Sequence, residues 1–146
     1  MSLARAAALL LAAAPLAGCL SIDAAANTQT CPGAETPRQV AELFFGRNIG
    51  QSLGVSEADF TRFLDEEVSP RFPDGLTVSD SQGRWLYKGE AFKEPGKRLT
   101  LILTGPADRR KLSEIAAAYE ARFHQDAVLI TTHGACVLFH LPDKVP

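Results

Sequence analysis

Two apolar stripes with helical spacing most constrain what this chain can fold into. The first consists of Phe60, Phe63, Leu64 and Val68, and the second consists of Leu112, Ile115, Ala116, Tyr119 and Phe123. Side chains three or four residues apart lie on the same side of a helix, so each predicted helix has one side to bury. Two such helices need a common apolar surface, and one face of a sheet provides it.

The first helix has the clearest start signal in the sequence. Ser56 can accept a hydrogen bond from the first helical turn, and Asp59 three residues later can bond back to it. Val55, just before the cap, can pack on Phe60. Pro70 ends the helix because a proline lacks the backbone donor that a helix interior requires.

Segments typical of strands alternate with the helices. We expect strands over residues 40–48, 76–78, 84–87, 99–104, 127–132 and 135–141, with a turn over 79–83 and a bulge or turn at Gly134. The order strand, helix, strand, strand, helix, strand predicts an α+β domain of the ferredoxin-like βαββαβ type. In this arrangement both helices lie on one face of a mostly antiparallel sheet, and an extra small hairpin lies in the middle of the chain.

The second face of such a sheet also needs an explanation, because its apolar residues cannot all point at the helices. The middle hairpin can cap this face, a second copy can cover it as in dimeric α+β barrels, or it can stay open as a ligand groove. We favour a homodimer through the sheet face, or a self-capped face, over a groove.

The N-terminal residues are typical of an export signal. A short apolar run follows Arg5 and ends in Leu16-Ala17-Gly18-Cys19. This ending resembles a bacterial lipobox, in which the cysteine thiol is acylated before cleavage and the lipid then holds the protein on a membrane. The run is shorter than the roughly 20 residues that span a bilayer. An ordinary secretory signal cut after Ala24-Ala25-Ala26 is the alternative, and it also exports the chain.

These features predict the organisation and location of the protein. We expect a signal peptide over 1–18, a flexible tether over 19–37 that begins at lipidated Cys19, and a single domain over 38–146. Leu20, rather than an aspartate, follows the cysteine, which favours the periplasmic side of the outer membrane if the host has one. The membrane would then be a partner through the lipid. A formal net charge of −2 disfavours nucleic acid as a partner.

Export leaves two cysteines to explain, Cys31 and Cys136. Exported compartments permit disulfides, and a bridge would pin the N-terminal tail to the sheet edge. Two unpaired thiols, with Cys136 buried in a strand, are the alternative. Neither cysteine has the spacing of a metal site, so we predict no metal and no cofactor.

Five polar or aromatic residues are weak candidates for a site. His124 follows the second helix, where it can act as an acid or base, and Arg71 with Asp74 can clamp an anion or orient it. Trp85 can stack on a ligand, and Arg47 can face the same opening. Each also has a plainer structural role: a helix cap for His124, a turn ion pair for Arg71 and Asp74, core capping for Trp85, and solvent exposure for Arg47.

Several motifs together resemble one known family. They are Val55–Phe60, Phe63–Val78, Gly83–Trp85, Lys93–Pro95 and Arg122–Gln125. They are similar to the bacterial family known as domain of unknown function 3574, over about residues 40–139. Members of that family often look like exported lipoproteins and have no assigned activity, so the resemblance implies no catalytic residues.

We therefore expect an exported envelope lipoprotein that acts as a noncatalytic binding or structural module. The alternative is a small enzyme of the dimeric α+β barrel type, which would use His124 with Arg71 or Asp74 on a small organic anion. The enzyme hypothesis predicts that His124, Arg71 and Trp85 meet in one concave pocket.

Overall fold

The computed structural model describes residues 30–140. The predicted signal peptide, the lipidation site Cys19, Leu20 and the last six residues of the predicted domain lie outside this part of the chain. Among the described residues, no helix combines the length and apolar character needed to cross a bilayer.

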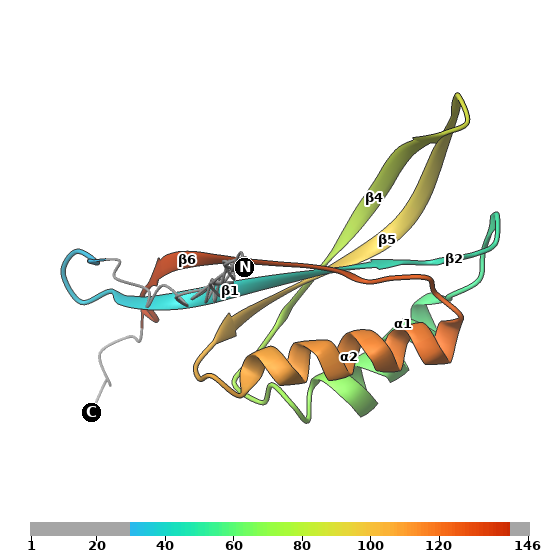
Figure 1. The fold of residues 1–146 in the computed structure, drawn as a ribbon. Coiled ribbons are helices and arrows are strands. Elements are labelled where there is room, and N and C mark those ends of the chain that lie inside the picture. Colours follow the sequence, from blue (N-terminus) through green and yellow to red (C-terminus); the bar gives the residue numbers. More distant parts are fainter. Residues whose placement is uncertain (1–29, 141–146) are drawn as a thin grey trace, which may run out of the picture.

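Four antiparallel strands form the main sheet, and both helices lie on one of its faces (Figure 1). The strands are β1 (Thr36–Gly46), β4 (Thr77–Tyr87), β5 (Glu90–Leu103) and β6 (Leu129–Val137), in the spatial order β4-β5-β1-β6. A small separate hairpin consists of β2 (Asn48–Ile49) and β3 (Ser52–Leu53). The chain order and sheet order are those of a ferredoxin-like domain, which confirms the predicted fold class.

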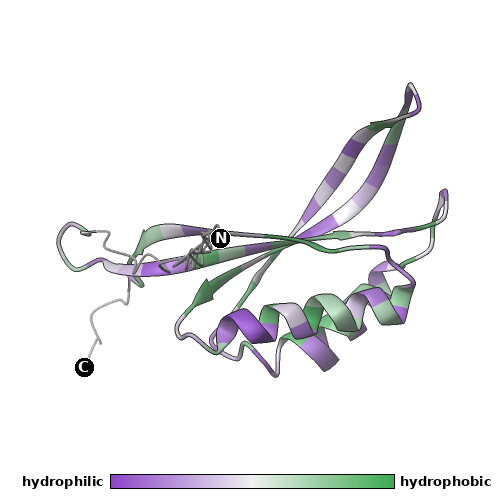
Figure 2. Ribbon diagram, viewed as in Figure 1, coloured by the Kyte–Doolittle hydropathy of each residue, from purple (hydrophilic) through white to green (hydrophobic). Residues whose placement is uncertain are grey.

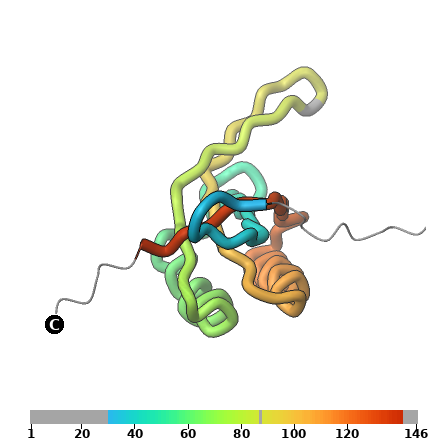
Figure 3. Tube along the Cα trace, turned by 90° about the vertical axis from the view of Figure 1, so that its left-hand side faces the viewer, coloured from blue at the N-terminus to red at the C-terminus, as the bar shows by residue number. Residues whose placement is uncertain are grey.

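Helix α1 (Glu57–Phe63) begins at the predicted cap. Ser56 accepts a hydrogen bond from the backbone of Asp59 at 3.1 Å, and its hydroxyl donates to the Asp59 carboxylate at 2.6 Å. The helix continues as a π-helical turn, η1 (Leu64–Val68), and α2 (Asp108–Phe123) lies beside it. Figure 3 shows the two helices side by side below the strands.

An aromatic cluster joins the helices to the sheet. Phe45 on β1 lies 5.6 Å from Phe60, 5.9 Å from Phe63 and 4.7 Å from Tyr119, measured between ring centroids. All four rings are almost completely buried. The predicted apolar stripes therefore form the core, because every member of this cluster faces the layer between sheet and helices.

The strands differ in extent from the sequence prediction. Residues 79–83 form part of β4 rather than a turn, and the chain reverses at Lys88 and Gly89, which both have positive φ. Polar residues typical of turns are accommodated here by cross-strand partners: Ser79 accepts from Arg98 at 3.2 Å, and Asp80 accepts from Lys97 at 2.5 Å. The predicted break at Gly134 is also wrong, because β6 is continuous.

The hairpin of β4 and β5 extends beyond the sheet as a two-stranded arm. Pairing of β1 with β5 ends at Gly46 and Gly96, whereas β4 and β5 stay paired to their turn. We call residues 82–95 the arm. It rises on the side of the sheet away from the helices (Figures 1 and 3), and hydrophobic and hydrophilic bands alternate along it (Figure 2).

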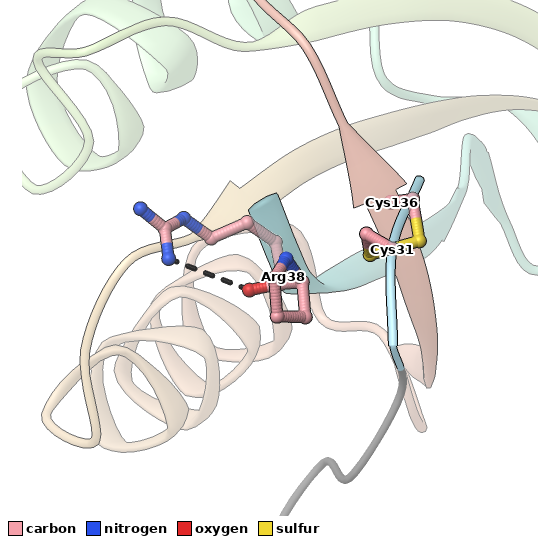
Figure 4. The surroundings of a disulfide bond; sticks show 4 residues. Cys31, Arg38 and Cys136 are labelled. Carbon is pink, nitrogen blue, oxygen red and sulfur yellow. Dashed lines mark hydrogen bonds between the residues drawn. A yellow bond between two sulfur atoms is a disulfide. The ribbon is translucent and has the colours of Figure 1, made fainter. Parts of the chain in front are cut away.

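The predicted disulfide is present between Cys31 and Cys136, whose Cα atoms are 5.5 Å apart (Figure 4). The two residues are 105 positions apart in the sequence. Since β6 is an edge strand, the bond attaches the segment before β1 to the edge of the sheet. This attachment lies at the end of β6 opposite Leu129.

Candidate functional site

An open groove of about 920 Å³ lies at the arm end of the sheet. Its walls are the arm on one side and, on the other, the end of β1, the β2–β3 hairpin and the loop from α2 to β6. Phe44 and Leu129, which pair across β1 and β6, line it from the face opposite the helices. The groove volume is within the range of sites that bind small molecules.

Glycines make the groove hollow. A methyl group on Gly46 would lie 2.5 Å from the carboxylate of Glu94, and one on Gly96 would lie 2.8 Å from the carbonyl oxygen of Phe45. Gly83 on the arm lies under the ring of Trp85, where an added Cβ would be 3.8 Å from the indole. Glycine in a strand often marks such a close approach.

An aromatic pair forms the arm side of the groove. Trp85 on β4 and Phe92 on β5 are directly opposite each other, with stacked rings 5.8 Å apart and 12° between their planes. Trp85 is 47% exposed. This pair offers a broad apolar surface that a planar or apolar ligand group can cover.

Hydrogen bonds fix the polar side of the groove. The Glu94 carboxylate accepts from the backbone of Asn48 at 2.9 Å, and the Gln125 amide donates to the carbonyl of Asn48 at 2.7 Å. His124 caps α2 in a left-handed conformation with φ of 52°, is exposed, and lines the groove beside Gln125. The β2–β3 hairpin and the loop after α2 are therefore joined at Asn48.

The floor of the groove is joined to the core by Tyr119. Its hydroxyl donates to the carbonyl of Gly46 at 2.7 Å. Burial is the largest effect on this phenol, and it raises the pKa of Tyr119 well above its ordinary value. The hydroxyl therefore keeps its proton, and with it this bond, throughout the physiological pH range.

Arg47 holds the frame of the groove rather than lining it. Its side chain is buried, donates to the carbonyl of Val55 at 2.9 Å, and forms an ion pair with Glu57. Its backbone carbonyl accepts from Gly54 at 2.9 Å and from Val55 at 3.0 Å. These bonds close the β2–β3 hairpin onto the start of α1.

Lys97 completes this ionic network on the helix side of the sheet. Its ammonium group lies 2.5 Å from Asp80 and 2.7 Å from Glu57. The hydrogen bonds to Asp80 and Glu57 raise the pKa of Lys97, and its ammonium lowers the pKa of both carboxylates. The network connects β4, β5 and α1, and each of its charged side chains has a partner of opposite charge.

The remaining candidates lie elsewhere. Arg71 donates to the backbone carbonyl of Glu67 at 2.6 Å and to its carboxylate at 2.9 Å, and it lies 3.6 Å from Glu114. Asp74 is exposed in the turn before β4. The structure therefore brings Trp85 and His124 to one groove, but not Arg71 or Asp74.

The sequence analysis did not find Glu94, Asn48 or Gln125. Gly46, inside the predicted strand 40–48, was the available signal that the backbone is closely approached at this place. Gly96 precedes the predicted strand 99–104, so it gave no such signal. Among residues 30–140, no group of three histidine, cysteine, aspartate or glutamate side chains is arranged to hold a metal ion.

The topology defines a ferredoxin-like α+β domain, and both helices of the described residues lie on one face of its sheet. The fold resembles that of a phage SAM lyase in complex with S-methyl-5′-thioadenosine, with a TM-score of 0.54, 12% identity, and coverage of 71% of this chain and 93% of the lyase. CutA from Synechococcus elongatus PCC7942 gives a TM-score of 0.47 at 10% identity, with coverage of 70% and 80% respectively. At these identities the likeness concerns the fold alone.

The family model described as "Protein of unknown function (DUF3574)" matches residues 40–139. The chain belongs to this family, which confirms the resemblance found in the sequence. No curated protein matched the sequence.

Proposed function

We propose that this protein is an exported cell-envelope lipoprotein and that its groove is a noncatalytic binding site. The lipobox-like Leu16–Cys19 supports the location, and so does the Cys31–Cys136 disulfide, because such bonds persist in oxidising compartments. With Leu20 after the acylated cysteine, the proposed address is the periplasmic side of the outer membrane, if the host has one.

The groove itself carries the proposal of binding. It combines a stacked aromatic pair with polar side chains that are held by bonds to the frame, as in the Glu94 and Gln125 contacts with Asn48. Preorganised walls lower the entropy lost when a partner binds. Arg47 and Lys97, which lie outside the groove, are both engaged in ion pairs with Glu57. The cations that line the groove are Arg84 and Lys93 on the arm.

The disulfide suggests how the domain is oriented. A tether from the membrane enters the domain at Cys31, which is bonded to the far end of β6 from the groove. A nine-residue strand is about 30 Å long. In our proposal the groove therefore faces away from the membrane and is open to partners in the surrounding space.

The enzyme alternative has one observation in its favour, because His124 and Trp85 line the same groove. Arg71, the residue expected to hold an organic anion, is bonded to Glu67 and lies outside the groove. The geometry therefore supports binding better than catalysis by these residues.

Metabolic labelling tests the lipid anchor. We expect the natural chain to incorporate a fatty-acid probe, and the Cys19→Ala variant to incorporate none and to keep its precursor mass. A mature chain that begins at Asn27 without lipid would overturn the anchor.

A thermal-shift screen with small metabolites and envelope components tests the groove, because a ligand that binds only the folded state raises the unfolding temperature. We expect any such shift to disappear in a Trp85→Ala variant and to persist in a variant with Arg71→Ala, a residue outside the groove. Shifts that persist in Trp85→Ala would place the site elsewhere.

A further inference from the structure

We propose that the ligand of the groove is an uncharged oligosaccharide. The proposal rests on the groove being a binding site, as proposed above, and it names the class of ligand. It does not depend on the lipid anchor.

The charges along the groove favour an uncharged ligand. The arm contributes two cations, Arg84 and Lys93, and the two anions of the lining are Glu94 on the arm and Asp126 after α2. Counting His124 as neutral, these charges balance. A ligand with a net charge of either sign would meet side chains that repel it. Hydroxyl groups, in contrast, can donate to the carboxylates and accept from the cations.

Glu94 is held in place and still has one oxygen to offer. Its Oε1 accepts from the backbone of Asn48 at 2.9 Å, which fixes the carboxylate beside Gly46. Within residues 30–140, its Oε2 accepts no hydrogen bond. A fixed carboxylate oxygen is a strong acceptor for a hydroxyl group, so Glu94 can anchor a polyhydroxylated ligand.

Two more polar groups of the groove are available to such a ligand. The amide nitrogen of Gln125 donates to the carbonyls of Asn48 at 2.7 Å and of Phe123 at 3.3 Å, which fixes the side chain. Ser81 pairs with Gly96, and its hydroxyl lies over the glycine floor. Among the described residues, neither the Gln125 oxygen nor the Ser81 hydroxyl has a hydrogen-bond partner. The groove therefore offers several acceptors and donors to one ligand.

Trp85 supplies the apolar part of the site. Its side chain is 47% exposed, and the ring of Phe92 supports it at 5.8 Å. Glu94 lies two residues after Phe92 on β5, so its side chain is on the same face of the arm as the two rings. The negative face of an aromatic ring attracts the C–H groups that cover one side of a sugar ring. The hydroxyls at the edge of that sugar can then reach the carboxylate.

A flat aromatic ligand fits the groove less well. It would also stack on Trp85, but it has few groups with which to bond Glu94, Gln125 and Ser81. Polar groups that lose water without gaining a partner cost free energy, so such a ligand would bind weakly. A ligand with one apolar face and many hydroxyls matches both parts of the site.

The size of the groove indicates more than one sugar ring. Its volume of about 920 Å³ is near the upper end of the range for small-molecule sites. The lining extends from Trp85 on the arm to Gln125 and Leu129 on the opposite wall. An oligosaccharide can contact both walls at once.

An array of oligosaccharides tests the ligand class, with the full chain purified in a detergent that has no sugar headgroup. We expect the chain to bind one or more uncharged members, such as chitotriose, maltotriose or cellotriose. We expect no binding of spermidine, the cationic probe, or of citrate, the anionic probe. Isothermal titration calorimetry then gives the Kd of the saccharide that binds.

Three variants locate the bound saccharide. Trp85→Ala removes the stacking surface, and Glu94→Gln keeps an acceptor for Asn48 but removes the charge, so each should weaken binding by about tenfold. Leu86→Ala is the matched control. Leu86 follows Trp85 on β4, is 75% exposed and lies outside the groove, so its variant should keep the natural Kd. Circular dichroism checks that each variant is folded.

The outcomes separate the two proposals. Spermidine or citrate binding that Trp85→Ala weakens would overturn the uncharged ligand and leave the groove a binding site. Saccharide binding that persists in both Trp85→Ala and Glu94→Gln would overturn the proposal as well, and so would the absence of any bound oligosaccharide. The binding function itself fails separately, if no compound in the thermal-shift screen gives a shift that depends on Trp85.

Discussion

At the scale of single residues, the shape of the groove depends on positions without a side chain. Gly96 lies where the backbones of β1 and β5 come close together. A Cβ atom at this position would lie 2.8 Å from the backbone oxygen of Phe45. Backbone cannot move aside as a flexible side chain can. Gly105, in contrast, precedes α2 in open space and has no positive φ.

We predict that Gly96→Ala lowers the free energy of unfolding by about 1–3 kcal/mol, because the added methyl forces β1 and β5 apart. Gly105→Ala is the matched control and should change it by less than about 1 kcal/mol. Urea unfolding of both variants measures the difference. A Gly96→Ala protein as stable as the natural chain would show that the two strands are not held at this spacing.

Asp108 is a second residue whose role follows from its contacts. Its buried carboxylate accepts from the backbone of Thr104 at 2.8 Å and of Gly105 at 3.0 Å, and it pairs with Lys111 at 2.8 Å. Burial alone raises the pKa of this carboxyl, but the bonds from Lys111 and the two backbone donors outweigh burial and lower the pKa.

A carboxyl whose pKa is lowered by folding stabilises the protein above its unfolded pKa and loses that contribution as the pH falls through its folded pKa. We predict that Asp108→Asn lowers the free energy of unfolding by about 1–3 kcal/mol at pH 7. The difference from the natural chain should shrink below pH 4. Urea unfolding at a series of pH values measures it, and a difference independent of pH would contradict the role of the charge.

At the scale of elements, the helices were more predictable than the strands. The cap at Ser56 and the stripe of Phe60 and Phe63 follow from local spacing, and both are confirmed. The length of β4 depends on partners far along the chain, since Asp80 is bound by Lys97. The local sequence of residues 79–83 therefore predicts a turn, although pairing with β5 makes these residues part of a strand.

The groove could be predicted only in part, for the same reason. Glu94 and Asn48 are 46 residues apart, and Gln125 is 77 residues from Asn48, so their contacts depend on the register of β1 with β5 and on the loop after α2. Trp85 and His124 were found because each stands at an element end or turn signal. That they line the same groove could not be predicted, because this depends on how all four strands of the sheet are arranged.

The disulfide is the strongest single link between elements. It closes a loop of 105 residues, for which the chain-entropy model gives about 4–5 kcal/mol of stabilisation as an upper guide. We predict that the double variant Cys31→Ser, Cys136→Ser loses up to this much free energy of unfolding. Dithiothreitol treatment of the natural chain should give the same loss, and equal stability with and without reductant would contradict the prediction.

At the scale of the whole molecule, the Cys31–Cys136 disulfide and the arm lie at opposite ends of one sheet (Figure 1). If a lipid at Cys19 anchors the chain, as we propose, the dozen or so residues from Cys19 to Cys31 would span about 20 Å as a random coil, and the domain would stay near the bilayer. The arm nevertheless points away from it in the orientation that we propose. Trp85 is the sole tryptophan of the sequence, so its fluorescence reports on the arm alone.

We predict that brominated lipids quench Trp85 little in vesicles that carry the lipidated protein. The control is the double variant Trp85→Phe, Phe139→Trp, which moves the fluorophore to an exposed position beside the disulfide end. That variant should be quenched strongly. Strong quenching of Trp85 itself would show that the arm faces the membrane.

The bond between Cys31 and Cys136 also decides how mechanical force enters the domain. A pull on the tether reaches Cys31 and divides there, one part passing along the backbone into β1 and the other through the sulfur atoms into β6. Because these two strands are neighbours, tension loads them together instead of peeling the first strand away from the sheet. A protein anchored by its N-terminus would thus resist being unravelled from the end at which it is held.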